Sequence, residues 1–272
     1  MAEIIAGIDA EINATEGVTW KELLLPVNRY RVFLVISLQI GVQLTGNTSL
    51  AYYAPQVFQT VGAGDSKLLI SGFFGIVKVV GCLIFLVFLV ERVGRKGALL
   101  GGAGFMGTMM LIVAVLTATH PPAPDATHVS PAGAAAITMI YLEAAAYNMS
   151  FGPVSWLYQS EIFPNRIREL ALAIGTSTQW LFNFVFSQAT PHAVDNLGWK
   201  TFLMFCIFNY ALVVYVWFFI KETKGKSLED MEAVFGSGYT QATPAQVEAA
   251  EHKMAETHNK EISSSHVESS RP

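Results

Sequence analysis

The sequence predicts an all-α integral membrane protein whose transmembrane part is a six-helix bundle. Hydrophobic residues make up 52% of the 272 residues and charged residues only 14%, and the mean hydropathy is +0.42. Soluble domains carry about 25% charged residues, so the deficit indicates a membrane environment. A helix needs about 20 apolar residues to cross the hydrocarbon layer. Six stretches have this length and character: 32–54, 68–90, 98–118, 132–157, 170–189 and 201–220.

Lys and Arg are distributed unevenly over the segments that connect these stretches. Eleven of them lie within residues 21–31, 92–96, 166–168 and 221–226, next to the first stretch or after the second, fourth and sixth, whereas Lys67 and Lys200 lie in the other connections. Basic residues concentrate on the cytoplasmic side of membrane proteins. We therefore expect both termini to lie in the cytoplasm.

The segments that flank the bundle differ from it in composition. Residues 1–31 are mixed and polar and are predicted to form a partly helical cytoplasmic linker. Residues 221–235 are predicted to be a cytoplasmic motif, and residues 236–272, rich in Ser, Glu, His and Ala, a disordered tail. Cys82 and Cys206 lie within apolar stretches, which favours small buried residues over a disulfide framework or metal ligands.

Several functional classes are disfavoured by composition and motifs. A formal net charge of −4 argues against a nucleic-acid partner. The sequence has no nucleophile–base arrangement, metal-ligand cluster or phosphate-binding loop. We therefore predict neither an enzyme nor a cofactor, and we expect the lipid bilayer as the surroundings of the bundle.

The fourth apolar stretch contains a predicted helix break. Gly152-Pro153 interrupts it, and Trp156 follows three residues after Pro153. A proline inside a helix removes a backbone hydrogen bond, which hydrocarbon tolerates only where the freed carbonyl faces protein or a watery cavity. Interrupted helices often form substrate sites in transporters. A kinked packing helix is the alternative interpretation.

Two charged residues lie deep within apolar stretches. Lys78 lies 13 residues before Glu91, and Glu143 lies 18 residues before Glu161. At about 1.5 Å per residue, they are roughly 20 and 27 Å from the inner ends of their helices. We expect a buried ion pair that joins two helices. The alternative is a role in proton coupling or in binding a carboxylate substrate.

Six motifs are spaced along the chain. They are Gln43-Leu-Thr-Gly-Asn-Thr-Ser-Leu-Ala-Tyr-Tyr-Ala-Pro, Glu91-Arg-Val-Gly-Arg-Lys, Gly152-Pro-Val-Ser-Trp, Glu161-Ile-Phe-Pro-Asn-Arg-Ile-Arg, Gln179-Trp-Leu-Phe-Asn-Phe and Glu222-Thr-Lys-Gly-Lys-Ser-Leu-Glu. In order and spacing these motifs resemble the sugar porters of the major facilitator superfamily, most closely the fungal quinate and sugar permeases. The resemblance implies the C-terminal half of a twelve-helix major facilitator fold.

The resemblance covers roughly residues 15 to 236, without the first six spans of such a transporter. Because residues 1–31 resemble the linker between the two halves of the family, we expect a truncated gene model whose missing N-terminal six-helix half belongs to the same chain. The alternative is a half-transporter that needs a second copy or a separate partner.

The resemblance implies a set of substrate contacts on the first span. Gln43 matches a family glutamine that bonds sugar hydroxyls, whereas Val42 replaces a second glutamine. The family asparagine falls at Thr48, with Asn47 one position earlier. These departures favour a substrate other than glucose. The alternative is that these side chains bond neighbouring helices.

Aromatic and amide side chains extend this candidate site. Trp156 and Trp180 offer flat faces to a sugar ring, and Asn183 shares a helical face with Trp180. Asn148 is a further candidate, and ordinary packing is the alternative for this group. By resemblance, two residues form an extracellular gate, with an aromatic belt as the alternative; they are Tyr52 and Tyr53.

By resemblance, a set of inner-face charges forms a salt-bridge lock that is closed in one conformation and open in the other. Charges that serve topology alone would explain its basic members but not its glutamates. The set is Glu91, Arg92, Arg95, Lys96, Glu161, Arg166, Arg168 and Glu222.

Together these features predict a membrane transporter, expected in the plasma membrane, that moves a sugar or a quinate-like polyhydroxylated acid by alternating access. Protons are a candidate coupling ion. The rival hypothesis is a transport-inactive half-length membrane protein that acts as a nutrient receptor or as a regulatory or assembly partner.

Overall fold

A computed structural model describes residues 18–61, 67–90, 92–121 and 129–226, together with Met231 and Phe235. The described residues contain helices and no strand, which confirms the predicted all-α class. They belong to a unit that ends at Phe235; residues 236–272 form a second unit. The predicted tail, the first 17 residues of the predicted linker and Glu91 lie outside the described residues.

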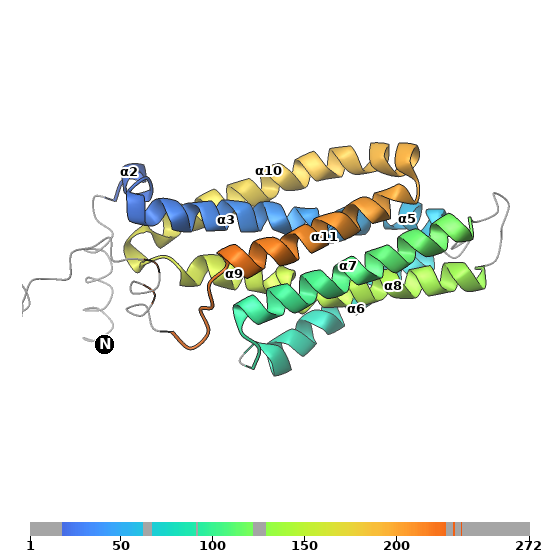
Figure 1. The fold of residues 1–272 in the computed structure, drawn as a ribbon, viewed down its shortest axis with the longest axis horizontal. Helices are drawn as coiled ribbons and strands as arrows, with labels where there is room; N and C mark the ends of the chain where they lie inside the picture. The colour runs from blue at the N-terminus through green and yellow to red at the C-terminus, as the bar shows by residue number, and fades with distance from the viewer. Residues whose placement is uncertain are drawn as a thin grey trace, which may run out of the picture. The chain divides into compact units, whose positions relative to one another are not determined.

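The helices follow the six predicted spans in order (Figure 1). A π-helix, η2, continues α6 without a gap. The bounds are α2 Trp20–Leu23, α3 Pro26–Leu44, α4 Asn47–Tyr52, α5 Ala54–Thr60, α6 Lys67–Ile84, η2 Phe85–Leu89, α7 Arg95–Thr119, α8 Pro131–Asn148, α9 Phe151–Glu161, α10 Asn165–Leu197 and α11 Lys200–Phe219.

Three of these helical segments are long and apolar enough to cross a membrane, among the described residues. They are Leu68–Leu89, Arg95–Thr119 and Lys200–Phe219, which match the second, third and sixth predicted spans. The first predicted span is divided between α3 and α4, and the fourth between α8 and α9. The fifth lies in α10, a 33-residue helix that contains Pro191.

The break between α3 and α4 is held by α11. Gly46 has φ +89°, a left-handed conformation that favours glycine, and a Cβ atom there would lie 2.7 Å from the ring of Phe205. The amide Nδ2 of Asn209 donates to the carbonyl oxygen of Thr45 at 3.0 Å. This bond satisfies a carbonyl that the interrupted helix leaves without its usual partner, as an apolar environment requires.

The break between α8 and α9 lies two residues earlier than the sequence predicts. The chain departs from helix at Ser150, with φ −141° and ψ −94°, and α9 resumes at Phe151. Gly152 and Pro153 therefore occupy the first turn of α9. Backbone N–H groups in a first turn have no intrahelical partner, so proline is tolerated there without the predicted interruption.

Helix α7 packs along α11 and α8, while α10 packs along α3 (Figure 1). Two clusters of buried apolar side chains fill the bundle. One contains Leu34 and Leu38 of α3, and the other contains Phe58 of α5 and Met110 of α7. The broken helices α3–α4 and α8–α9 run through both clusters, so their polar side chains are held among closely packed neighbours.

Replacing Gly46 with alanine should destabilise the bundle. The left-handed backbone costs about 1–2 kcal/mol for a residue with a Cβ atom, and displacing the Phe205 ring adds about 1–3 kcal/mol. Gly225→Ala is the matched control, because Gly225 has φ +71° and nothing lies within 4 Å of the place that its Cβ atom would take. Thermal unfolding in detergent should show a clearly larger loss for Gly46→Ala; equal losses would contradict the role of Phe205.

Candidate functional site

Three amide side chains recur every four residues along α3 and α4. Gln39, Gln43 and Asn47 are each 0% exposed. Each donates from its amide nitrogen to another helix: Gln39 to Oε1 of Gln159 at 2.9 Å, Gln43 to the carbonyl oxygen of Gln179 at 3.4 Å, and Asn47 to Oε2 of Glu143 at 3.1 Å. This amide row therefore connects the first span with α9, α10 and α8.

The same three amides keep unused acceptors. Their side-chain oxygens, Oε1 of Gln39, Oε1 of Gln43 and Oδ1 of Asn47, have no hydrogen-bond partner among the described residues. Buried polar atoms in folded proteins are nearly always paired with protein, water or ligand. The amide row can thus accept hydrogen bonds from a hydroxylated molecule or from water without losing its contacts between helices.

Gln179 joins this set although it was not among the residues predicted from the sequence. Its carbonyl oxygen accepts from Gln43, and its own Oε1 is buried without a partner among the described residues. Gln179 directly precedes Trp180 and lies one helical turn before Asn183, so its place in the same motif could have identified it. Val42, beside Gln43, is buried among apolar side chains.

The two tryptophans and Asn183 lie on the helices that the amide row contacts. Trp156 is on α9 and is 41% exposed, and Trp180 is on α10 and is 62% exposed. Asn183 is partly buried. Because both indoles are largely uncovered in this half, they are available to stack on a ring. Their role in binding stays a prediction.

Asn148 and Thr48 have other partners. Nδ2 of Asn148 donates to the carbonyl oxygen of Ala144 at 2.8 Å, within its own helix. The hydroxyl group of Thr48 lies near that of Tyr147 on α8. Such contacts are of the kind expected from packing between or within helices, and substrate contact at these two positions stays untested.

The two predicted gate tyrosines differ in their surroundings. Tyr52 is 56% exposed, whereas the hydroxyl group of Tyr53 donates to the carbonyl oxygen of Ser187 on α10 at 2.7 Å. A second bond, from Thr190 to Ser49 at 2.7 Å, joins α10 to α4 nearby. Tyr53 thus bonds the end of the first span to the fifth span, as expected of a gate residue. The gate itself stays a prediction.

Lys78 and Glu143 do not form the predicted ion pair. The described residues contain two salt bridges, and neither involves these side chains. The ammonium group of Lys78 lies 5.7 Å from the ring centroids of Phe74 and of Tyr147, in cation–π geometry. Glu143 is instead bonded by Asn47. The sequence predicted the pair from the similar distances of the two residues from the inner ends of their helices. In the structure, each side chain contacts a different neighbour.

Arg95 and Glu161, expected on the cytoplasmic side, are the two members of the predicted lock that form an ion pair. The guanidinium of Arg95 contacts the carboxylate of Glu161 at 2.6 Å, with further bonds from Nε at 3.1 and 3.3 Å. The hydroxyl group of Thr223 donates to Oε2 of Glu161 at 2.6 Å. This Arg95–Glu161 pair connects the start of α7 to the end of α9.

Glu222 caps the beginning of α7. Its carboxylate accepts from the backbone N–H groups of Arg95 at 2.8 Å and Lys96 at 3.1 Å, and from those of Thr223 and Lys224. An anion at a helix N-terminus is stabilised by these free N–H groups and by the helix dipole. Although partial burial acts to raise the pKa of Glu222, these bonds outweigh it and hold the pKa below its usual value.

Three other residues of the predicted lock, Arg166, Arg168 and Lys96, bond partners outside the Arg95–Glu161 pair. Arg166 bonds Glu22 of α2 at 3.0 and 3.1 Å rather than Glu161, and Arg168 donates to the carbonyl oxygen of Phe163 at 3.3 Å. Lys96 donates to the backbone carbonyl of Trp217, and Lys224, which was not in the predicted set, donates to that of Arg92. Among the described residues the predicted set therefore contains one internal ion pair, Arg95–Glu161, while Arg166 pairs with Glu22 outside the set.

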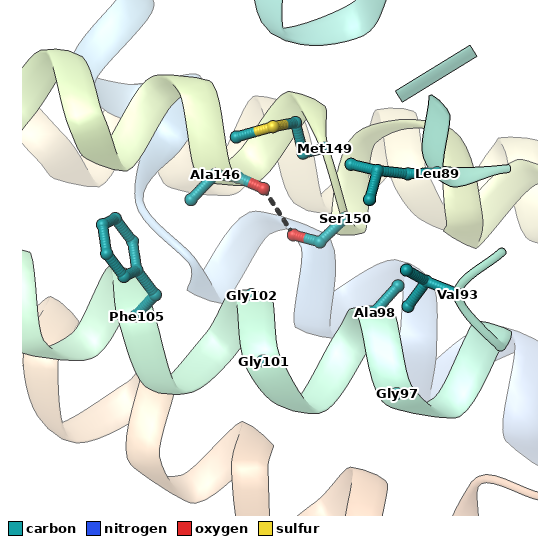
Figure 2. Close-up of a pocket in the computed structure, with 10 residues that line it drawn as sticks. All are labelled: Leu89, Val93, Gly97, Ala98, Gly101, Gly102, Phe105, Ala146, Met149 and Ser150. Carbon is teal, nitrogen blue, oxygen red and sulfur yellow. Dashed lines mark hydrogen bonds between the residues drawn. The ribbon is translucent and has the colours of Figure 1, made fainter. Parts of the chain in front are cut away.

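A pocket of about 350 Å³ lies away from all of these residues. Figure 2 shows it between the end of η2, α7 and the α8–α9 break, with Leu89, Val93, Phe105 and Met149 around it. The hydroxyl group of Ser150 points to the carbonyl oxygen of Ala146, its partner at 2.6 Å. With that hydroxyl paired and the other side chains apolar, the pocket offers no polar recognition of a sugar.

Discontinuous helices, a buried amide row and paired inner-face charges are features of membrane transporters. The chain belongs to the sugar transporter family, since the family model "Sugar (and other) transporter" matches residues 1–235. It is 35% identical over 210 residues to the quinate permease of Emericella nidulans and 34% identical over 209 residues to a probable quinate permease of Aspergillus niger. Both matches cover 76% of this chain but 39% of the relative, so the chain spans well under half of their length.

Solved structures agree with this assignment. The proton:xylose symporter XylE bound to 6-bromo-6-deoxy-D-glucose matches with a TM-score of 0.64 at 32% identity, over 75% of this chain and 42% of XylE. The inward open conformation of XylE from E. coli matches with a TM-score of 0.67 at 27% identity, over 86% and 46%. The fold is thus that of part of a major facilitator transporter, and its relatives are transporters rather than enzymes.

Acid should remove the contribution of Glu222 to stability. A lowered pKa in the folded chain stabilises it above the ordinary glutamate pKa of about 4.3, and this stabilisation is lost as the pH falls through the lowered value. Glu222→Gln should therefore lower the unfolding temperature at pH 7, and this difference should shrink as the pH falls below the ordinary glutamate pKa. Exposed Glu169 gives the control, Glu169→Gln. A gap that persists unchanged at pH 3 would contradict this assignment.

If the Arg95–Glu161 pair is the predicted lock, breaking it in a chimera with the N-terminal half of a relative should shift the balance between inward-open and outward-open states. Glu161→Gln is expected to change this equilibrium by about 1–3 kcal/mol, measured as cysteine accessibility from the two sides of the membrane. Arg168→Gln is the control, because Arg168 bonds a backbone carbonyl rather than a carboxylate. Equal accessibility in both variants and the parent would show that the charges serve topology only.

Proposed function

We propose that the chain forms the substrate-binding C-terminal half of a transporter that moves a sugar or a quinate-like polyhydroxylated acid by alternating access. The observation that supports this most directly is the amide row, in which Gln39, Gln43 and Asn47 combine burial with unused acceptor oxygens. Hydroxyl groups are the donors that such oxygens accept. A site of this kind discriminates strongly, since an unmatched buried polar group is costly.

The residues favour quinate or another non-glucose substrate within this class. Val42 lies in the apolar core, where family hexose carriers place an amide, and Thr48 is engaged with Tyr147. Each neutral hydrogen bond lost costs about 0.5–1.5 kcal/mol. Two such losses would weaken glucose binding about 10- to 100-fold. The similarity to a quinate permease and a probable quinate permease supports the same choice.

The membrane setting and the mechanism complete this proposal. The family and the three apolar helices indicate a membrane protein; we propose the plasma membrane, with both termini in the cytoplasm. Alternating access requires a second half, which this chain would meet in the same polypeptide or as a separate one. The Arg95–Glu161 pair would then open and close at the inner face as the two halves move.

The test is competition uptake by a chimera in a yeast strain that lacks hexose transport. This chain replaces the matching part of the Emericella nidulans quinate permease, and labelled quinate is the substrate. Unlabelled quinate and galacturonate should compete better than glucose. Better competition by glucose would overturn the choice of substrate. Quinate binding to the chain without uptake by the chimera would favour a receptor.

Variants of the chimera separate binding from folding. Gln43→Leu removes an unused acceptor and should raise the KM for quinate about two- to tenfold, the equivalent of about 0.5–1.5 kcal/mol. Ser49→Ala is the control, because Ser49 is equally buried on the same span but is bonded by Thr190. An equal rise in both variants would assign the effect to helix packing.

A further inference from the structure

Glu143 is a buried carboxyl group with an incomplete set of partners. It lies on α8 and is 0% exposed. Its Oε2 accepts from Nδ2 of Asn47 at 3.1 Å, while its Oε1 has no hydrogen-bond partner among the described residues. One neutral amide donor is far less than a buried carboxylate needs, because taking the charge out of water costs several kcal/mol.

Among the described residues around Glu143, one carries a positive charge, and its charged group contacts other side chains. Lys78 on α6 is close enough to act electrostatically on Glu143, but its ammonium sits against the rings of Phe74 and Tyr147 instead of forming a salt bridge. An ammonium group on a four-carbon stem can move between such positions by changing rotamer.

Within the part of the chain that the structure describes, the other elements that pack on α8 add no further charge near this site. On α4, Asn47 and Thr48 are neutral. The charged residues of α7, Arg95 and Lys96, lie at its inner end, where Arg95 is paired with Glu161 of α9. On α8 itself, Tyr147 lies near Thr48, and the hydroxyl group of Tyr141 donates to the carbonyl oxygen of Ile70 at 2.6 Å.

We propose that Glu143 is a proton-binding site of this half of the transporter. In the conformation described, the carboxyl group is neutral and holds the proton. It releases the proton to water when Lys78 leaves the two aromatic rings and reaches the carboxylate. The charges balance, since an ammonium beside a neutral acid becomes an ammonium–carboxylate pair plus one released proton. Neither state leaves an unpaired carboxylate in the core.

The site is linked to the amide row through Asn47. The same side chain donates to Glu143 and keeps Oδ1 unused, and it follows Gln43 by four residues across the α3–α4 break. A substrate hydroxyl that binds Oδ1 would therefore share the Asn47 amide with the proton site. This coupling rests on the proposed transport function, whereas proton binding by Glu143 does not.

Infrared spectroscopy of the whole purified chain in lipid nanodiscs, without substrate, tests proton binding. At neutral pH the chain should show the carbonyl band of a protonated buried carboxyl group. Glu143→Gln should remove this band, and Glu161→Gln, which neutralises a carboxylate paired with Arg95, should leave it. A band that is absent from the parent, or that survives Glu143→Gln, would overturn the proposal.

Removing the lysine gives a second measurement in which Glu143 is unchanged, and it covers the case that Glu143→Gln does not fold. Without its ammonium partner the carboxylate is less stable, so in Lys78→Met the band should persist to a pH higher by about one unit or more. Lys78→Arg should titrate near the parent. If the band appeared only in Lys78→Met, Glu143 of the parent would be permanently ionised beside Lys78. This result would overturn the proposal of a proton site.

The coupling is measured separately in the chimera with the quinate permease. A proton gradient should stimulate quinate uptake by the parent chimera, and Glu143→Gln should abolish this stimulation. Stimulation retained in that variant would overturn the coupling through Asn47. Because the infrared measurement needs neither substrate nor the second half, a failure of the transport proposal would leave the proton site standing, and the reverse also holds.

Discussion

A helix that is interrupted in an apolar environment must find new hydrogen bonds for its freed backbone groups, and the arrangement of this bundle depends on meeting that requirement twice. At the first break, Asn209 of α11 bonds the carbonyl oxygen of Thr45, and Phe205 packs where only glycine fits at position 46. At the second, the hydroxyl group of Ser150 bonds the carbonyl oxygen of Ala146. Both breaks are thus built into the packing, and they allow polar side chains to enter the core where a continuous apolar helix would present none.

The polar side chains that enter there contact neighbouring helices and still keep unused acceptors. In the amide row, each nitrogen holds a neighbouring helix and each oxygen remains unused among the described residues. A single amide can do this because its donor and acceptor are separate atoms, whereas a hydroxyl group or a lysine could not divide its roles in the same way. Helix packing and substrate recognition are therefore not competing interpretations of Gln43 and Asn47, although from the sequence alone they stood as alternatives.

Hydrophobic patterning was sufficient to predict the all-α class, and motif order was sufficient to predict the family. Both signals are properties of the residue order along the chain. The predictions that were wrong or missing concern details that composition along the chain does not determine. Depth predicted that Lys78 and Glu143 would meet, but an aromatic pair and the Asn47 amide satisfy them separately. The break near Gly152 was placed two residues late, because a proline is compatible with the first turn that follows a break. The partner of Arg166, Glu22, is 144 residues away, a separation at which no local pattern predicts contact.

The role proposed for the Arg95–Glu161 pair depends on the second break. Helix α9 has 11 residues, is separated from α8 by the break at Ser150, and ends at Glu161, which Arg95 holds to the start of α7. Glu222 caps that same start, and Thr223 bonds Glu161, so the segment after α11 is attached to both helices. A short helix hinged at one end and bonded at the other can tilt only if the bonds at its far end are released. We infer that the Arg95–Glu161 pair and the α8–α9 break act together as one two-state element, in which the break supplies the freedom to move and the ion pair sets which position is favoured.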